Sequence, residues 1–490
     1  MKEIAKGSSM LTAVSIGEML MRFVRTKFIA LMLGTAGMGF LAQLTILFEA
    51  LRVLGDIGSR RAVIKQVAEE HFKGVPSVKY RNVLQTAFLL TTVASMITAL
   101  AVSVFSSRIS QLLYGDTSHY PFIIFLALLL PVASFCTVVS SVVKGNLDYI
   151  AYAKYTLGAY LAVIALTPIL IYAFKVWGAV AAMGLFYLMP LLGYLLFNLK
   201  KPFLHFSKGI SRGALKEQFT QGFTQIYQDA LAHAIRIAVA GWIVRDLGLH
   251  RMGIYQVVLT FTTVYMAVPI QAMSGYVFPL IAGAKNNEEI CLAINDSFRY
   301  LMFVLVPVIL GIMVLPEMLI YLLYSHEFVP AVPVLRTQIF STLFLLMGYS
   351  CMASLAARGK LKSVVINSSL HTFIFFILAS TLFPKFQLMG VAIAYSTAAF
   401  VNVLMQYAWS WHYFRTRLYP KNLKLMAMTI IWAAGAFVLL RISDHVLMRV
   451  GVLVFGIVWF LVSSKDHERE FIWTKARCCF RRLEIVERKV

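Results

Sequence analysis

Fourteen stretches of about 20 apolar residues run along the chain, and this feature limits its possible folds more than any other. They cover residues 10–33, 39–58, 83–106, 121–143, 151–174, 177–199, 219–244, 253–282, 301–324, 333–356, 363–383, 388–411, 425–441 and 447–464. A helix of about 20 apolar residues spans the hydrocarbon core of a bilayer and satisfies its own backbone there. Charged residues are only 14% of the chain, against about 25% in soluble domains. The sequence therefore predicts an all-α polytopic membrane protein with about 14 transmembrane helices.

The basic residues between the spans are concentrated on one predicted side of the membrane. On that side lie "SRRAVIK", "NLKKP", "RGKLK" and "FRTRLYPKNLK", whereas "YGDTSH" and "PKFQ" lie on the other. Cytoplasmic loops carry an excess of Lys and Arg, so both termini are expected in the cytoplasm. The net charge of +23 thus reflects topology, and nucleic acid is not a predicted partner. The first span lacks a cleavage signal and is expected to be retained.

Four short motifs recur in the same order at nearly constant spacing. They are "LGTAGMGF" and "LGLHRMGI", "LLYGD" and "LLYSHE", "KGNL" and "RGKL", and "GAVAAM" and "GVAIAY". The repeat predicts two six-helix halves of the same orientation, related by an axis along the membrane normal, as in some transporters. The predicted organisation is a first half at 1–199, a basic cytoplasmic linker at 200–218, a second half at 219–411, two additional helices at 412–464 and a basic cytoplasmic tail at 465–490.

Polar and ionisable residues within the spans are the candidate functional residues. The candidates are Glu18, Arg22 and Arg25 in the first span, Glu49 and Arg52 in the second, and Gln225, Tyr227, Asp229, His233 and Arg236 in the seventh. In the repeat, Arg22 aligns with Arg236. Two interpretations stay open: charge pairs that hold helices together, or side chains that line a water-filled cavity and bind a polar substrate. Arg336 and Glu317, near span ends, are expected to extend toward the interface.

The excess of arginine over carboxylate favours an anionic substrate, because guanidinium binds phosphate bidentately. The predicted substrate-binding residues are Arg22, Arg25, Arg52, Arg236, Gln225 and Tyr227, and the candidates for coupling to an ion gradient are Glu18, Glu49, Asp229 and His233. The sequence contains no nucleotide-binding motif, no metal-ligand spacing and no catalytic constellation. We therefore predict no cofactor, no metal and no enzymatic activity.

The segment "KFIALMLGTAGMGFLAQLTILFEALRVLGDIGSRRAVIKQVAEE" at 27–70 resembles the opening of polysaccharide-transport proteins of the multidrug/oligosaccharidyl-lipid/polysaccharide exporter superfamily. The "LLYGD" and "KGNLDYIAYAK" stretches fit the same family. The resemblance implies two six-helix bundles in a V shape around a central cavity, which is exposed alternately to the two sides. It also implies undecaprenyl-pyrophosphate-linked sugars as cargo, as for the O-antigen flippases of bacterial inner membranes.

The leading hypothesis is a flippase that moves a lipid-linked oligosaccharide from the cytoplasmic to the periplasmic leaflet. Three alternatives remain: a flippase for a lipid-linked peptidoglycan precursor, a cation-coupled exporter of small molecules, and a membrane enzyme such as a sugar polymerase or ligase. A cavity for cationic drugs should be acidic, and such enzymes need reactive groups in large external loops, so both fit less well. The expected partners are the lipid-linked cargo, the bilayer and polysaccharide polymerase or assembly proteins.

Overall fold

The computed structural model describes residues 2–57, 59–71, 78–200, 204, 212–266, 270, 277–278, 280–442 and 445–463, and the extended regular elements in these ranges are all helices. These are α1 (Lys2–Asp56), α2 (Ser59–His71), α3 (Val78–Val104), α4 (Ser106–Tyr114), α5 (Tyr120–Gly145), α6 (Tyr149–Lys200), α7 (Arg212–Leu259), η1 (Thr260–Val264), α9 (Asn287–Val314), α10 (Pro316–Leu323), η2 (His326–Ala331), α11 (Val332–Ala357), α12 (Leu361–Phe414), α13 (Pro420–Ile442) and α14 (Val446–Ser463). Most of the predicted linker and the whole predicted tail lie outside the described residues.

Four of the long helices are each divided by a kink. The kinks lie at Gly34 in α1, Lys175 in α6, Gly248 in α7 and Gln387 in α12. Together with α3, α5, α9, α11, α13 and α14, the divided helices correspond to the predicted spans, except that part of the eighth span, 253–282, lies outside the described residues. Eight of the helices are long and apolar enough to cross a membrane by length and composition. The predicted all-α polytopic fold class is confirmed.

The internal repeat is visible in the backbone. Gly34 and Gly248 are 214 residues apart in the sequence and both have positive φ, 62° and 83°. Lys175 and Gln387 are 212 residues apart, and each has a φ of 51°. A positive φ is uncommon for residues with a Cβ, so the matching pair of non-glycine kinks is a distinctive shared feature. The two halves therefore use the same turns at equivalent positions.

One predicted span is wrong in its position. The apolar window placed the ninth span at 301–324, but the structure has α9 at Asn287–Val314 and a separate short helix, α10. The helix begins early because Asn286 caps it, with its side chain accepting a hydrogen bond from the Glu289 amide at 2.8 Å. It ends before Pro316, which starts α10. A hydropathy window cannot detect a polar first turn or a proline break.

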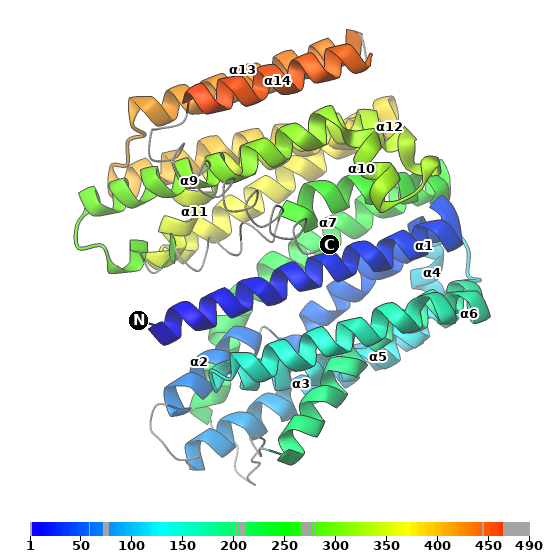
Figure 1. Cartoon of the computed structure of the whole chain (residues 1–490). Coiled ribbons are helices and arrows are strands. Elements are labelled where there is room, and N and C mark those ends of the chain that lie inside the picture. Colours follow the sequence, from blue (N-terminus) through cyan, green and yellow to red (C-terminus); the bar gives the residue numbers. More distant parts are fainter. Residues whose placement is uncertain are drawn as a thin grey trace, which may run out of the picture.

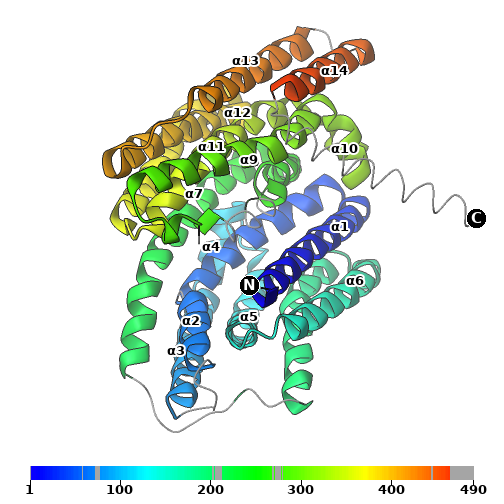
Figure 2. The ribbon, with the colours of Figure 1, turned by 60° about the vertical axis from the view of Figure 1, so that its left-hand side comes forward.

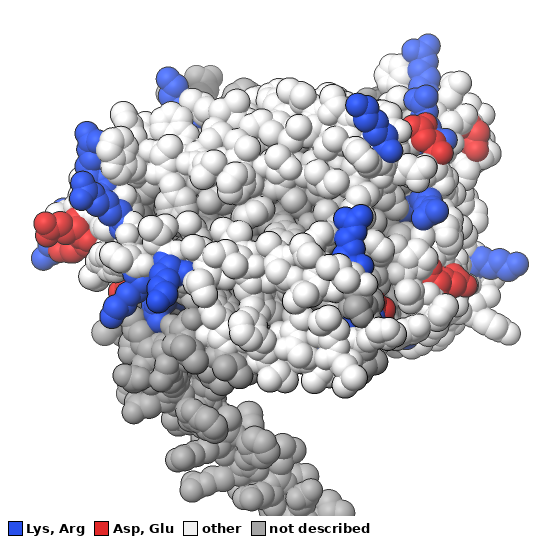
Figure 3. Space-filling view, turned by 90° about the horizontal axis from the view of Figure 1, so that it is seen from above, with Lys and Arg blue, Asp and Glu red and all other residues white. Residues whose placement is uncertain are grey.

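The long helices run side by side between two ends of the molecule. Figure 1 shows α2 near one end and α4 and α10 at the other. In Figure 2, α2, α3, α5 and α6 form one group, and α9, α11 and α12 form a second group that is covered by α13 and α14. Figure 3 shows charged side chains at both ends of one face and a broad uncharged band between them. Such a band matches the hydrocarbon core of a bilayer.

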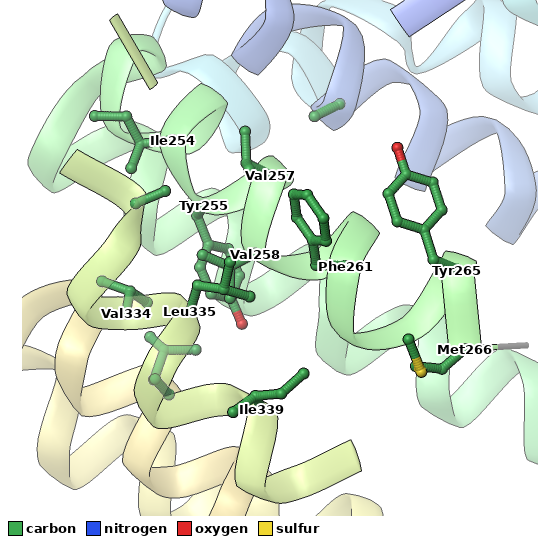
Figure 4. Packing of buried hydrophobic residues seen from close by; sticks show 14 of the residues in the cluster. Ile254, Tyr255, Val257, Val258, Phe261, Tyr265, Met266, Val334, Leu335 and Ile339 are labelled. Atoms are coloured by element: carbon green, nitrogen blue, oxygen red, sulfur yellow. The ribbon is translucent and has the colours of Figure 1, made fainter. Parts of the chain in front are cut away.

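The halves meet where α1 crosses α7 at a pair of equivalent glycines. A Cβ on Gly39 would lie 2.0 Å from the Leu249 carbonyl oxygen, and one on Gly253 would lie 1.9 Å from the Thr35 carbonyl oxygen. Small residues let membrane helices approach closely. Beside this crossing, α7 and α11 bury an apolar core (Figure 4), and its labelled side chains include Tyr255, Val258, Phe261, Leu335 and Ile339.

The additional helices are tied to the second half by ion pairs. Arg449 of α14 bonds Glu317 of α10 through both guanidinium nitrogens, at 2.6 and 3.0 Å. Arg336 of α11 also approaches Glu317, at 3.5 Å, and its side chain is 9% exposed. The expectation that Arg336 and Glu317 extend toward the interface stays a prediction. The single carboxylate of Glu317 offsets part of the charge of the two arginines.

Candidate functional site

The first span of α1 places two arginines and one carboxylate one helical turn apart. The Nε and Nη2 atoms of Arg22 donate to Oε1 of Glu18 at 3.2 and 2.8 Å. This i,i+4 spacing brings the two groups together on the helix surface. The Arg22 side chain is still 45% exposed. The predicted charge pair exists, but it leaves Arg22 accessible.

Arg25 has no carboxylate partner within the described residues. Its Nε is buried without a hydrogen bond. Its guanidinium carbon lies 5.5 Å from the ring centroid of Phe186 on α6, and that of Arg22 lies 5.2 Å from the same ring. Arg25 also lies within range of the positive charge of Arg22. This pair of cations carries one compensating carboxylate, Glu18, so the cluster is net positive.

The second span of α1 carries a different kind of cluster, centred on Arg52. Its guanidinium contacts Glu49 at 3.2 Å and Asp56 at 3.3 Å. It also donates to the hydroxyl groups of Tyr187 at 3.1 Å and Thr137 at 3.2 Å. The Arg52 side chain is only 11% exposed. Two carboxylates more than balance the charge of this arginine, so the geometry favours a role in joining α1, α5 and α6.

The seventh span faces α12 through uncharged polar groups. Gln228 donates to the Ser368 hydroxyl at 3.1 Å, and Ser369 donates to the Tyr227 hydroxyl at 3.3 Å. His233 has a buried Nδ1 with no hydrogen bond. Arg236 is exposed. The one carboxylate among the predicted residues of this span is Asp229.

The two sets of predicted residues lie on different halves, but they are electrostatically connected. His233 lies within range of the charges of Glu49 and Arg52 on α1 and of Asp229 and Arg236 on its own helix. Asp229 also takes part in another contact in the structure. The side chain of Gln225 lies outside the described residues. The structure gives no contact between Arg22 and Arg236, and their sharing of one cavity stays a prediction.

Sequence reasoning missed the aromatic residues of α6 that organise the first cluster. Phe186 supports both arginines, Tyr160 stacks on Phe186, and Tyr187 bonds Arg52 and Glu49. They lie in a uniformly apolar stretch, where nothing distinguishes a functional aromatic residue from a lipid-facing one. Their only signal is position, on the span that packs against α1.

Two other features of the described chain do not coincide with these clusters. A largely apolar cavity of about 520 Å³ is bounded by α11, α12 and α13. Its lining includes Phe340, Phe344, Phe400 and Phe437, and it includes none of the predicted site residues. Among the described residues, no group of three His, Cys, Asp or Glu could hold a metal ion.

Comparison with known families identifies the chain. A family model described as "Polysaccharide biosynthesis protein" matches residues 28–333. The chain belongs to this family. A probable low-salt glycan biosynthesis flippase of Haloferax volcanii is 24% identical over 427 residues, covering 82% of each chain. The lipid III flippase of Escherichia coli is 21% identical over 380 residues, covering 75% of this chain and 89% of the relative.

The chain also superposes on solved structures of membrane transporters. The lipid II flippase MurJ in an inward closed conformation superposes with a TM-score of 0.70 at 15% identity, covering 94% of this chain and 99% of that one. An inward-facing multidrug transporter of the MATE family superposes with a TM-score of 0.67 at 16% identity, covering 82% and 98%. At these identities the likeness establishes the fold alone.

Proposed function

We propose that this protein is a flippase that moves an undecaprenyl-pyrophosphate-linked oligosaccharide across the bacterial cytoplasmic membrane. The pyrophosphate is bound by arginines that α1 and α7 present to a central cavity, which opens alternately to each side. The protein performs no covalent chemistry. Its termini are cytoplasmic, and the cargo enters from that side.

One observation carries this proposal: the membrane-spanning part of α1 contains an arginine without a carboxylate partner among the described residues. A cation at bilayer depth costs roughly 2.5–3.5 kcal/mol on insertion scales. Arg22 and Arg52 offset this cost with Glu18, Glu49 and Asp56, but Arg25 does not. An anionic head group in the cavity supplies the missing countercharge.

The alternatives differ in how well they fit this charge. A cavity for cationic drugs would place a net negative cluster in the first span of α1, whereas the Arg22–Arg25 cluster there is net positive. A peptidoglycan-precursor flippase carries the same pyrophosphate and fits equally well by charge. The matched family and the glycan flippase relatives favour a saccharide destined for a surface polysaccharide, such as an O-antigen of lipopolysaccharide.

Energy coupling is proposed for the polar stripe of α7. Asp229 and His233 are one helical turn apart, and His233 lies within range of charges from both halves. A change in cargo occupancy near Arg236 would alter the electrostatic surroundings of both groups. Glu18 and Glu49 are already held by arginines and are the weaker candidates. Polysaccharide polymerase or assembly proteins are the proposed partners on the receiving side.

The decisive experiment is deletion of the gene followed by mass spectrometry of the lipid-linked saccharides that accumulate. Accumulation of an undecaprenyl-pyrophosphate oligosaccharide, with loss of the matching surface polysaccharide, is the expected result. Accumulation of the peptidoglycan precursor would assign the alternative cargo. Normal levels of every lipid-linked saccharide would contradict the proposed function.

A further inference from the structure

The ring of Phe186 contacts one aromatic ring and two guanidinium groups. Tyr160 stacks on it with the ring centroids 4.5 Å apart and the planes 29° apart. The guanidinium carbons of Arg22 and Arg25 lie 5.2 and 5.5 Å from the Phe186 centroid. One aromatic ring thus lies against two cations that are three residues apart on α1.

This arrangement holds like charges close together, which needs a physical reason. The negative face of an aromatic ring attracts a guanidinium by about 0.5–2 kcal/mol, depending on desolvation. Glu18 bonds Arg22 and partly screens it, but it makes no bond with Arg25. Arg22 and Arg25 lie within range of each other's charge. The contact of Phe186 with both cations therefore offsets part of their repulsion.

We propose that Phe186 is a positioning residue that sets Arg22 and Arg25 as a paired grip for a diphosphate. This inference rests on the proposed function and names which part of the cargo the first half recognises. A diphosphate carries two anionic groups joined by one oxygen, so each guanidinium binds one of them. A monophosphate engages only one guanidinium well. The geometry thus favours diphosphate over monophosphate lipid carriers.

The experiment measures binding of two soluble probes, geranyl diphosphate and geranyl monophosphate, to the detergent-purified full-length chain by calorimetry. The test variant is Phe186→Leu, which keeps an apolar side chain but removes the ring. Phe186→Tyr and Phe186→Trp restore a ring. The matched control is Phe376→Leu, because Phe376 is also half-buried and stacks on Trp242 at 5.4 Å, without an arginine among its ring contacts.

Phe186→Leu should weaken diphosphate binding about tenfold and monophosphate binding about threefold or less, since two cation–π contacts are lost. Phe186→Tyr and Phe186→Trp should bind within about twofold of the native chain, and Phe376→Leu should not change binding. This selective loss separates positioning from general destabilisation, which would weaken both probes equally. Phe186→Leu could fail to yield folded protein, and two other variants then test the proposal. Phe186→Trp should keep the preference for diphosphate over monophosphate, and Arg25→Gln should lose that preference.

Three outcomes would overturn the proposal, and they differ in whether the proposed cargo class fails as well. If the native chain binds neither probe, the proposed cargo class fails, and the positioning role of Phe186 fails with it. If the native chain prefers the diphosphate and folded Phe186→Leu keeps that preference, only the positioning role fails. Equal binding of both probes by the native chain would also reject the paired grip.

Discussion

The two halves of the molecule share their turns but not their chemistry. Gly34 and Gly248 make equivalent kinks, and Gly39 and Gly253 meet at the crossing of α1 and α7. In contrast, α1 carries arginines paired with carboxylates and aromatic rings, whereas α7 faces α12 through amides and hydroxyl groups. The backbone features are thus repeated where the two halves pack against each other. The side chains differ at the residues that we propose bind cargo.

The aligned arginines illustrate the difference. Arg22 and Arg236 occupy equivalent positions in the repeat, but Arg22 bonds Glu18 and lies over Phe186. Arg236 instead lies within range of His233 and His371. A guanidinium that is held by a carboxylate and an aromatic ring is fixed in position, which suits recognition of one chemical group. A guanidinium beside histidines, whose charge changes on protonation, suits a response to changes in local charge. We infer that the first half holds the head group rigidly, and that the second half, whose Arg236 also contacts the head group, couples its movement to an ion gradient.

The largest expected effect comes from the shared scaffold. Gly39→Ala or Gly253→Ala would place a Cβ within 2.0 Å of a backbone carbonyl oxygen, which forces α1 and α7 apart. Each should lower the free energy of unfolding by about 3 kcal/mol or more and strongly reduce the yield of folded protein. Gly435→Ala in α13 is the control, because a Cβ there meets no atom within 4 Å. Size-exclusion profiles after detergent extraction measure the yield. Normal profiles for both variants would contradict the close approach of α1 and α7 at these glycines.

The next largest effects are expected at the arginines, which test whether the two halves have different roles in transport. Arg25→Ala removes charge-assisted hydrogen bonds to the proposed diphosphate and should lower export ten- to a hundredfold. Its protein level should stay unchanged, since no carboxylate partner is left unpaired among the described residues. Arg25→Lys should recover little, because Lys cannot bind bidentately. Complementation of the deletion strain, with protein levels from immunoblots, measures both quantities.

Arg236→Ala sharpens the same comparison. If the second half only couples transport, this variant should keep diphosphate binding within about threefold and lose export. If Arg236 binds the head group as Arg25 does, both binding and export should fall together. Export at the native level in both Arg25→Ala and Arg236→Ala would show that the cationic spans do not bind cargo.

A smaller, structural effect is expected at Arg52. Arg52→Ala leaves Glu49 and Asp56 without their cation, and Asp56 is only 14% exposed. The free energy of unfolding should fall by about 2–4 kcal/mol. This loss is smaller than for a fully buried ion pair because the Glu49 side chain is 42% exposed. Thermal unfolding of the purified protein measures the loss, and Arg25→Ala is the matched control that should not show it. A stable Arg52→Ala protein that fails in export would instead make Arg52 a cargo ligand.

Much of this architecture could be predicted from the sequence, because it depends on hydropathy and on repetition. The fourteen spans follow from the length of apolar runs, and the motifs around Gly34 and Gly248 reveal the repeat. Pairs one turn apart, such as Glu18 and Arg22, follow from helix geometry. The place of Phe186 could not be predicted, because an aromatic residue within an apolar run carries no signal of what its ring will contact.

The loops that follow α4 and α10 show the same contrast on a smaller scale. In the second half, the carbonyl groups of Tyr321 and Tyr324 at the end of α10 accept hydrogen bonds from Lys27 of the first half, the former at 2.7 Å. In the first half, the equivalent loop is closed internally by Asp116. It accepts bonds from the Ser118 hydroxyl at 2.7 Å and the Ser118 amide at 2.9 Å. One loop joins the halves, and the other stabilises only itself.

The smallest predicted effect follows from that local loop. Hydrogen bonds from the Ser118 side chain and then from His119 lower the pKa of Asp116 below its usual value near 3.9. A lowered pKa means that ionised Asp116 stabilises the folded state at neutral pH, and that this contribution is lost as pH falls through the pKa. Asp116→Asn should therefore lower the melting temperature slightly at pH 7, and the difference from the native chain should shrink below about pH 4. Asp296→Asn, at an exposed position on α9, controls for the loss of any surface carboxylate. A difference that grows toward acid pH would mean that the loop favours the protonated carboxyl.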